Sequence, residues 1–280
     1  MTMRFAESAQ EAWTPPLGLR GRTRAFARRQ VLSFTRMTRK PSQADFIRCI
    51  YSHAIFPEAK DHLRTFIRTL KSQADFIDTP TLVEMMASKQ PVRGRYYHLS
   101  FDDGFANVVE TGGDVFASEK VPYTLFVSTD LIGASIEQME GYNETQLLYA
   151  LPVRTLTWDQ LRACGAAGGE VGCHTRTHAR LSAISGDDAR LRDEIVAAKA
   201  RIEAEIGTPC RSFAWPYGKM GDIDAKALAA IEEAGFDITF SAVRGRVTPG
   251  STSLMKVPRH QVEFHWPLWE NLLWAGGCRE

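Results

Sequence analysis

The stretch Tyr96-Tyr-His-Leu-Ser-Phe-Asp-Asp-Gly104 places two adjacent carboxylates directly after an apolar run. Successive strand side chains point to opposite faces and like charges repel, so we expect Asp102 and Asp103 where a strand ends. Gly104 can adopt positive φ, which lets the backbone turn and bring both carboxylates toward one space. A bound cation would relieve their repulsion; a solvated Asp-Asp-Gly turn is the alternative.

Strand-like and helix-like segments alternate after this stretch. Beyond residues 96–101, the predicted strands are 123–128, 171–174, 212–215, 238–243 and 255–258, and the predicted helices are 158–166, 187–206 and 222–234. The alternation predicts a parallel α/β architecture, either a barrel or an open sheet. In both, the functional site lies at the carboxyl ends of the strands, where Asp102 and Asp103 fall.

The region before the first strand has a helical pattern. The apolar spacing of 44–51 and 63–70 fits a period of 3.6 residues, and a cap-like Thr79-Pro80-Thr81 precedes 82–86. We therefore expect three regions: a basic leader at 1–40 that is poorly ordered or peripheral, a helical segment at 41–94, and the α/β part at 95–280.

Composition indicates an ordinary globular protein. The 280 residues are 44% hydrophobic and 24% charged, and the net charge of +1 argues against a nucleic-acid partner. Residues 20–40 carry seven arginines, Lys40 and no acidic side chain. This leader could contact an anionic membrane surface or an acidic substrate, or it could be a solvated surface arm.

The five cysteines show no CxxC spacing, so neither a disulfide framework nor a cysteine zinc site is indicated. No pattern typical of a signal peptide opens the sequence. We expect a cytoplasmic protein, with peripheral contact at the inner membrane face through the leader as a hypothesis.

A second motif, Gly172-Cys-His-Thr-Arg-Thr-His178, also follows an apolar run. Imidazoles four residues apart can converge on one cation in a helix or tight turn, although such a pair also arises by accident. Together with Asp103, His174 and His178 would form the donor set of a catalytic zinc or related divalent ion.

A third motif is Phe213-Ala-Trp-Pro-Tyr-Gly218. Pro216 fixes its own φ and Gly218 permits a sharp exit, so this turn could aim the backbone N–H of Tyr217 at developing negative charge. The alternative is an aromatic loop packed on the core.

These ordered motifs, Ser-Phe-Asp-Asp-Gly, His-Thr-x-x-His and Trp-Pro-Tyr-Gly, resemble the first three of the polysaccharide deacetylase family, the NodB homology domain. The resemblance spans roughly residues 42–262, and the helical segment is similar to that of exopolysaccharide and poly-N-acetylglucosamine deacetylases. It implies a distorted (β/α) barrel with fewer than eight strands, preceded by a helical N-terminal segment packed on it. The implied activity is metal-dependent removal of N-acetyl groups from an amino sugar.

The resemblance implies a role for each motif residue. Asp102 would be the general base, and Asp103, His174 and His178 would hold one divalent ion, with zinc expected and cobalt, manganese or nickel as alternatives. The backbone N–H of Tyr217 would stabilise the oxyanion.

The sequence also departs from the family pattern. Ala214 stands where the third motif often has the arginine that tethers the base, and no clear fourth motif or final leucine-x-histidine follows. Val257-Pro-Arg-His260 resembles the Pro-Arg-Ile form of the exopolysaccharide subgroup. Arg259 could therefore orient Asp102 and His260 could be the general acid, although neighbours on a strand face opposite ways and both can serve only at a strand end.

Several other side chains have simpler interpretations. We expect His98 to be a hydrogen-bonded core histidine and Cys173 a buried thiol. Trp158 and Trp215 are expected to line the pocket, whereas Trp266, Trp269 and Trp274 fit the core face of a helix.

The expected partner is an N-acetylated amino sugar, in a nucleotide- or lipid-linked precursor or in a polysaccharide. The alternatives are a deformylase or amidase acting on a non-polysaccharide amide, and a catalytically silent glycan-binding protein.

Overall fold

A computed structural model of the chain describes residues 4–13, 30, 32–35, 44–147 and 149–278. Most of the predicted basic leader, including all its arginines between residues 20 and 29, lies outside these residues. The described stretch 4–13 carries the short helix α1 (Ala9–Ala12) and packs on the rest of the chain: the Ala6 N–H donates to the Pro152 carbonyl at 2.9 Å.

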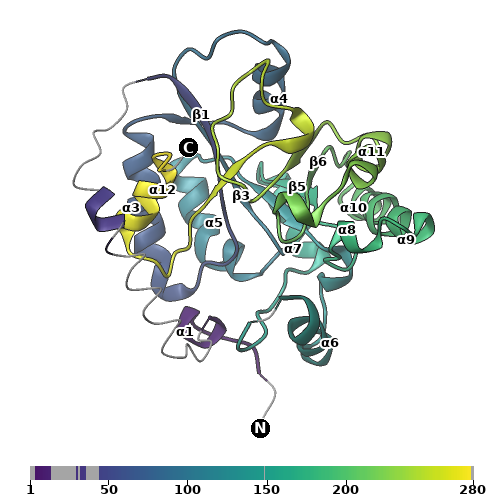
Figure 1. Cartoon of the computed structure of the whole chain (residues 1–280). Helices are drawn as coiled ribbons and strands as arrows, with labels where there is room; N and C mark the ends of the chain where they lie inside the picture. The colour runs from purple at the N-terminus through teal and green to yellow at the C-terminus, as the bar shows by residue number, and fades with distance from the viewer. Residues whose placement is uncertain (1–3, 14–29, 31, 36–43, 148, 279–280) are drawn as a thin grey trace.

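Parallel strands form the centre of the molecule (Figure 1). The sheet runs in the order β7-β6-β5-β4-β3-β1-β8, and the two-residue β2 pairs with the first half of β3. The bounds are β1 Phe46–Ser52, β2 Asp75–Phe76, β3 Arg95–Phe101, β4 Thr124–Val127, β5 Glu170–Cys173, β6 Ser212–Ala214, β7 Ile238–Phe240 and β8 Arg259–Gln261.

No regular ladder joins β7 to β8 among the described residues: an isolated bridge links Phe240 to Val257, just before β8, and leaves a seam. The seven strands from β7 to β8 thus form a nearly closed barrel, which confirms the expected distorted (β/α) barrel.

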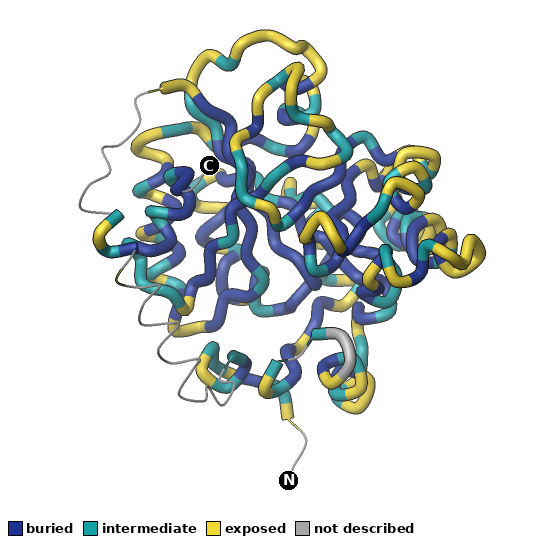
Figure 2. Tube along the Cα trace, in the orientation of Figure 1, coloured by how far each residue is buried: buried dark blue, intermediate teal, exposed yellow. Residues whose placement is uncertain are grey.

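Helices cover the outside of the barrel, as the buried strands and exposed outer turns of Figure 2 show. The predicted helices at 158–166, 187–206 and 222–234 are confirmed. The helix bounds are α3 Lys60–Lys71, α4 Thr79–Ala87, α5 Asn107–Glu119, α6 Ile136–Tyr142, α7 Trp158–Ala166, α8 Leu181–Ile184, α9 Asp188–Arg192, α10 Ala198–Ile206, α11 Ala225–Glu233 and α12 Leu268–Ala275. Among the described helices, none has the length and apolar composition that crossing a bilayer requires.

The prediction of a helix at 44–51 is wrong, because these residues form β1, which pairs with β3 on one side and β8 on the other. All seven β1 residues are buried. A strand buried on both faces has a nearly continuous apolar run, and over so short a segment this run also fits a helical period. The segment 41–94 therefore contributes a central barrel strand as well as α3 and α4, which were predicted correctly.

The last strand was predicted at 255–258 but lies at Arg259–Gln261. Pro258 has no N–H to give to a ladder, so it stands just before the strand, and residues 254–256 form a single 3₁₀ turn. Because the strand begins at Arg259, this arginine is a strand residue and is fully buried in the barrel.

The barrel interior is a packed core. Ile47, Cys49, Phe126 and Phe240 belong to one buried cluster, to which α4 adds Leu82 and Met86. His98 is buried there as predicted: its Nε2 and the Thr79 hydroxyl hydrogen-bond at 3.0 Å, and its ring stacks on Phe240. Burial lowers the pKa of His98 to about 3, so this ring is neutral.

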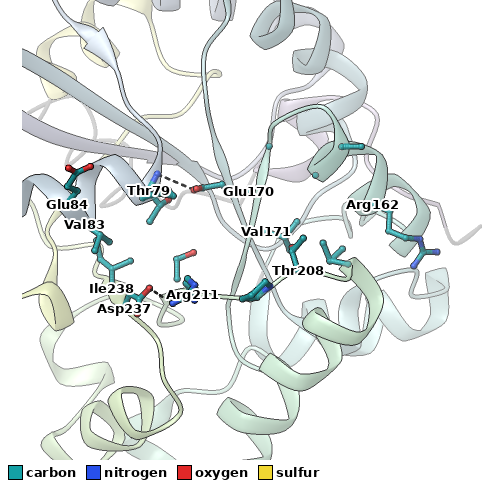
Figure 3. A pocket seen from close by; sticks show the side chains of 17 residues that line it. Thr79, Val83, Glu84, Arg162, Glu170, Val171, Thr208, Arg211, Asp237 and Ile238 are labelled. Carbon is teal, nitrogen blue, oxygen red and sulfur yellow. Dashed lines mark hydrogen bonds and ion pairs between the residues drawn. The ribbon is translucent and has the colours of Figure 1, made fainter.

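A cavity of about 720 Å³ lies beside the amino ends of β5, β6 and β7, between α4 and the end of α7 (Figure 3). Several of its charged side chains are engaged: Arg211 pairs with Asp237 at 3.2 Å, and Glu170 accepts from the Thr79 N–H. The candidate metal ligands lie instead at the carboxyl ends of the strands, as expected for this architecture.

Candidate active site

The Asp-Asp-Gly motif forms a turn directly after β3. Asp102 and Asp103 are both buried, and the Asp102 N–H donates to the Ser52 carbonyl at the end of β1. Asp103 has φ 70° and Gly104 has φ 73°. Two successive residues of positive φ turn the chain sharply, which brings both carboxylates toward the barrel axis instead of to opposite faces.

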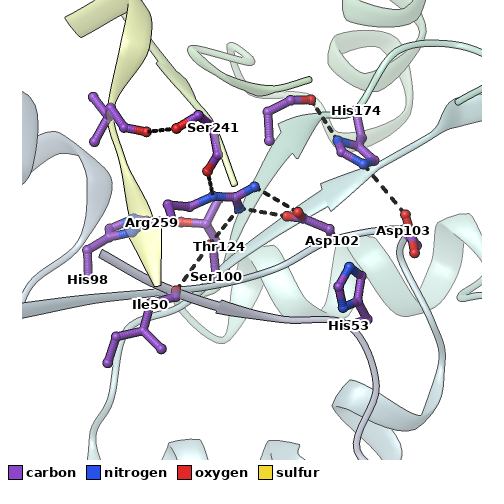
Figure 4. A network of polar contacts seen from close by, with 12 residues as sticks. Ile50, His53, His98, Ser100, Asp102, Asp103, Thr124, His174, Ser241 and Arg259 are labelled. Carbon is purple, nitrogen blue, oxygen red and sulfur yellow. Dashed lines mark hydrogen bonds and ion pairs between the residues drawn. The ribbon is translucent and has the colours of Figure 1, made fainter. Parts of the chain in front are cut away.

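Arg259 lies against Asp102 inside the barrel (Figure 4). Its Nη1 donates to Oδ1 of Asp102 and its Nη2 to Oδ2, each at 2.7 Å. The same guanidinium donates to the Ser100 hydroxyl and the Ser241 carbonyl, and the arginine is fully buried. Five fixed donors match this set of acceptors, so β8 supplies the tether that Ala214 cannot supply.

Asp103, His174 and His178 form a compact buried cluster whose ligand atoms lie within 4.8 Å of one another. Oδ1 of Asp103 is 3.5 Å from Nε2 of His174 and 3.3 Å from Nε2 of His178. Nδ1 of His174 donates to the Ala214 carbonyl at 2.6 Å, which fixes the tautomer and turns Nε2 toward Asp103.

The charge states of this cluster suit a cation. Burial lowers the pKa of His174 to about 4, which leaves its imidazole neutral and able to coordinate. Burial alone would raise the pKa of Asp103, but His178, His53 and His174 outweigh it and hold that pKa well below its usual range. Two imidazoles and one carboxylate are the donor types of a catalytic divalent metal site, so these residues fit such an ion.

Residues with an unfavourable left-handed backbone conformation are concentrated at this end of the barrel. Six described residues other than glycine have positive φ, and four of them belong to the three motifs: Asp103, Thr175, His178 and Tyr217. Left-handed backbone is unfavourable for residues with a Cβ, and it persists where the surroundings hold it for function.

The Trp-Pro-Tyr-Gly turn closes one wall of the site. A Cβ on Gly218 would lie 2.3 Å from the Cβ of Ala242, so only glycine fits there. Tyr217 has φ 63° and its ring packs edge-on against His178. Trp215 lines the site as predicted. Trp158 does not, because it lies at the start of α7 with its ring near Arg201.

His260 is not brought to this site. It follows Arg259 on β8, and alternation turns it away from Arg259, so its Nε2 donates to the Gly245 carbonyl at 3.1 Å. It is absent from the residues that line the cavity around Asp102 and Asp103.

A third histidine, His53, lines the cavity together with His174 and His178, and no sequence motif predicted it. It follows β1, and its Nδ1 lies 2.5 Å from Oε1 of Glu263, just beyond β8. Figure 4 shows its ring on the side of Asp102 and Asp103. Had 46–52 been interpreted as a strand, the rule that sites lie at carboxyl strand ends would have pointed to His53.

Glu263 gives His53 a distinct charge state. Burial acts to lower the pKa of His53, but the carboxylates of Glu263, Asp103 and Asp102 outweigh it and raise that pKa to about 9. Glu263 is itself oriented by the Ser52 hydroxyl and the Gln261 amide. The site thus places an imidazole of raised pKa in the same cavity as the carboxylate of Asp102.

The hydroxyl of Tyr149 donates to Oδ2 of Asp103 at 3.2 Å, leaving Oδ1 toward the histidines. Trp13 of the N-terminal stretch packs edge-on against Tyr149, so the start of the chain buttresses this wall. The cavity measures about 140 Å³, and its lining is Tyr51, His53, Asp102, Asp103, Leu147, Tyr149, His174, His178, Trp215, Tyr217, Gly218 and Ala242.

Solved structures of similar fold include IcaB from Ammonifex degensii, at 21% identity with a TM-score of 0.65, covering 84% of this chain and 98% of that one. The deacetylase PplD of Streptococcus pyogenes in complex with acetate gives 16% identity, a TM-score of 0.63 and coverage of 84% and 98%. A de-N-acetylase from Aggregatibacter actinomycetemcomitans is 17% identical with a TM-score of 0.64, and the match covers 80% of this chain and 97% of that one.

No curated protein matches the sequence. A sequence model described as polysaccharide deacetylase matches residues 89–239, which include all three motifs. By this match the chain belongs to the polysaccharide deacetylase family.

Proposed function

We propose that this protein is a divalent-metal-dependent hydrolase that removes N-acetyl groups from an amino sugar of a surface polysaccharide or its precursor. The observation that carries the proposal is one small cavity in which Asp102, tethered by Arg259, faces both the Asp103-His174-His178 cluster and the His53-Glu263 pair. Structures of similar fold include a de-N-acetylase and a deacetylase in complex with acetate, which supports acetyl removal as the chemistry.

Asp103, His174 and His178 would hold the ion. When bound, a divalent ion supplies Lewis acidity, which makes a neighbouring water more acidic and polarises an acetyl carbonyl. Asp102 accepts the proton of the water that attacks the carbonyl carbon, and Arg259 keeps the accepting oxygen in place. The backbone N–H of Tyr217 donates to the oxygen that gains negative charge.

Departure of the nitrogen requires a proton. We propose His53 as the donor, because its raised pKa keeps it protonated at neutral pH and it lines the same cavity. As the C–N bond breaks, His53 gives its proton to the nitrogen, and the products are acetate and the free amine. Glu263 holds Nδ1, so the transferred proton comes from Nε2.

The test is release of free amine from N-acetylglucosamine oligomers and from nucleotide-linked N-acetylglucosamine, with and without a chelator. We expect activity that the chelator abolishes, that added Zn²⁺ or Co²⁺ restores, and that Asp102→Asn removes. Asp114→Asn, a surface carboxylate paired with Lys60, is the matched control and should remain active. Activity that survives the chelator or Asp102→Asn would refute the proposal.

Including formylated and non-sugar acetamides in this assay separates the proposal from an amidase or deformylase. A silent glycan-binding protein is disfavoured because it has no use for a buried Asp102–Arg259 pair beside a protonated His53.

A further inference from the structure

The loop that connects His174 to His178 is held in an unfavourable backbone conformation. Thr175 has φ 66° and His178 has φ 59°, and neither is glycine. This conformation turns Nε2 of His178 to within 3.3 Å of Oδ1 of Asp103. Because left-handed backbone is disfavoured for residues with a Cβ, contacts from outside the loop must hold it.

Those contacts come from Glu194. Its Oε2 accepts hydrogen bonds from two successive backbone N–H groups, that of Arg176 at 3.0 Å and that of Thr177 at 2.9 Å. Its Oε1 accepts from the Thr177 hydroxyl at 2.6 Å. Glu194 is 2% exposed, so its carboxylate is buried, and it accepts three hydrogen bonds from this loop. Successive N–H groups on one anionic oxygen are the arrangement of a backbone nest.

The element that carries Glu194 is itself irregular. A wide π-helical turn, η4 (Asp193–Ala197), joins α9 to α10, and such turns occur frequently at functional sites. The neighbouring Asp193 accepts from Nη1 of Arg176 at 2.5 Å. This one turn therefore contacts both the backbone and a side chain of the loop.

The opposite edge of the loop is bonded elsewhere. The Thr129 N–H donates to the Thr175 carbonyl at 3.3 Å, and the Asp130 N–H donates to the Arg176 carbonyl at 3.0 Å. Carbonyls on one side and amides on the other are thus both fixed, but the amide side rests on the single carboxylate of Glu194.

We propose that Glu194 is a positioning residue for the metal site: by binding the Arg176 and Thr177 amides it holds the loop conformation that turns His178 toward Asp103. Glu194 acts through the loop and touches neither the ion nor the substrate. The inference rests on the metal site of the proposed function. Partners of this kind typically change metal affinity 10- to 100-fold.

The test measures Co²⁺ affinity by chelator competition and the visible absorption spectrum, together with the melting temperature. Glu194→Ala should weaken Co²⁺ binding at least about tenfold. At subsaturating Co²⁺ its visible spectrum should differ from that of the wild type, and excess Co²⁺ should restore the wild-type spectrum. Glu194→Gln keeps one oxygen for the two amides and an NH₂ group for the Thr177 hydroxyl, so most of the affinity should return.

Ile195→Ala is the matched control, because Ile195 is the next residue on the same turn and is fully buried in the core. It should lower the melting temperature and leave Co²⁺ affinity unchanged. If Glu194→Ala does not fold, Thr177→Ala removes one of the three hydrogen bonds from the partly exposed loop and should weaken affinity a few-fold.

Wild-type affinity in Glu194→Ala, or in Thr177→Ala where that variant is used, would overturn the inference. Equal affinity losses in Glu194→Ala and Ile195→Ala would also do so. A wild-type protein that binds no Co²⁺ would instead refute the metal site of the proposed function.

Discussion

The guanidinium of Arg259 donates to both carboxylate oxygens of Asp102 at 2.7 Å, joining residues 157 positions apart in the chain. The pair is buried, and Arg259 does not line the cavity. Its effect on catalysis is therefore expected to pass through Asp102.

Arg259→Lys should lower kcat about 10- to 100-fold with KM nearly unchanged, because an ammonium cannot hold both oxygens of Asp102. Steady-state kinetics on acetylated oligomers checks this. Arg211→Lys, at an exposed ion pair with Asp237, is the control and should match wild type. A rise in KM with constant kcat would contradict the assignment.

His53→Gln should lower kcat about 10²- to 10⁴-fold, the usual contribution of a general acid. The residual rate should be higher on substrates whose leaving nitrogen needs no proton, such as activated anilides. His260→Gln provides the comparison, since His260 does not line the cavity. Should His260→Gln be the more damaging of the two, the general acid would be misassigned.

Stability of the chelator-treated protein should fall between about pH 6.5 and 9. Folding raises the pKa of His53 to about 9, so its contribution is complete below the unfolded value near 6.5 and is lost as pH rises through 9. Urea unfolding across this range measures it. In His53→Gln the decrease of the unfolding free energy with pH that this group causes should vanish. An unchanged decrease would mean that Glu263 does not stabilise the imidazolium.

His98 should produce the opposite dependence at acid pH. Its folded pKa is about 3, so the unfolded chain takes up a proton below about pH 6.5 that the folded chain excludes, and stability falls with falling pH. His98→Gln should flatten the curve between about pH 3 and 6. His53→Gln should not, since His53 is protonated in both states there; equal flattening in both variants would argue against the assignment.

Gly218→Ala should destabilise the protein by about 1–3 kcal/mol, the usual cost of overpacking, and should reduce kcat. The added Cβ would lie 2.3 Å from Ala242 at a φ of 70°, which displaces the Tyr217 turn. Gly221→Ala, where a Cβ meets nothing within 4 Å, should be neutral. Thermal unfolding and kinetics of both variants test this, and equal effects would contradict it.

Local pattern was sufficient for much of this fold and site. The helices α7 and α11 and the strands β3 to β7 follow from period and turn residues, because each is decided within about ten residues. Local pattern also predicted that four side chains would meet at the carboxyl ends of the strands, because each motif places its polar residues in a turn directly after a strand. These are Asp102, Asp103, His174 and His178.

Contacts between distant parts of the chain account for the features that no local pattern predicts. Residues 46–52 became a strand because β3 and β8 flank them, and no local period reports such neighbours. That placement brings His53 to Glu263, 210 positions away, whereas His260 lies outside the cavity. The motifs alone predicted which side chains would hold a metal and which would accept a proton, because each motif carries its own donor groups. The contact of Arg259 with Asp102 and the place of His53 in the same cavity follow from barrel closure, because closure pairs strands that are distant in sequence.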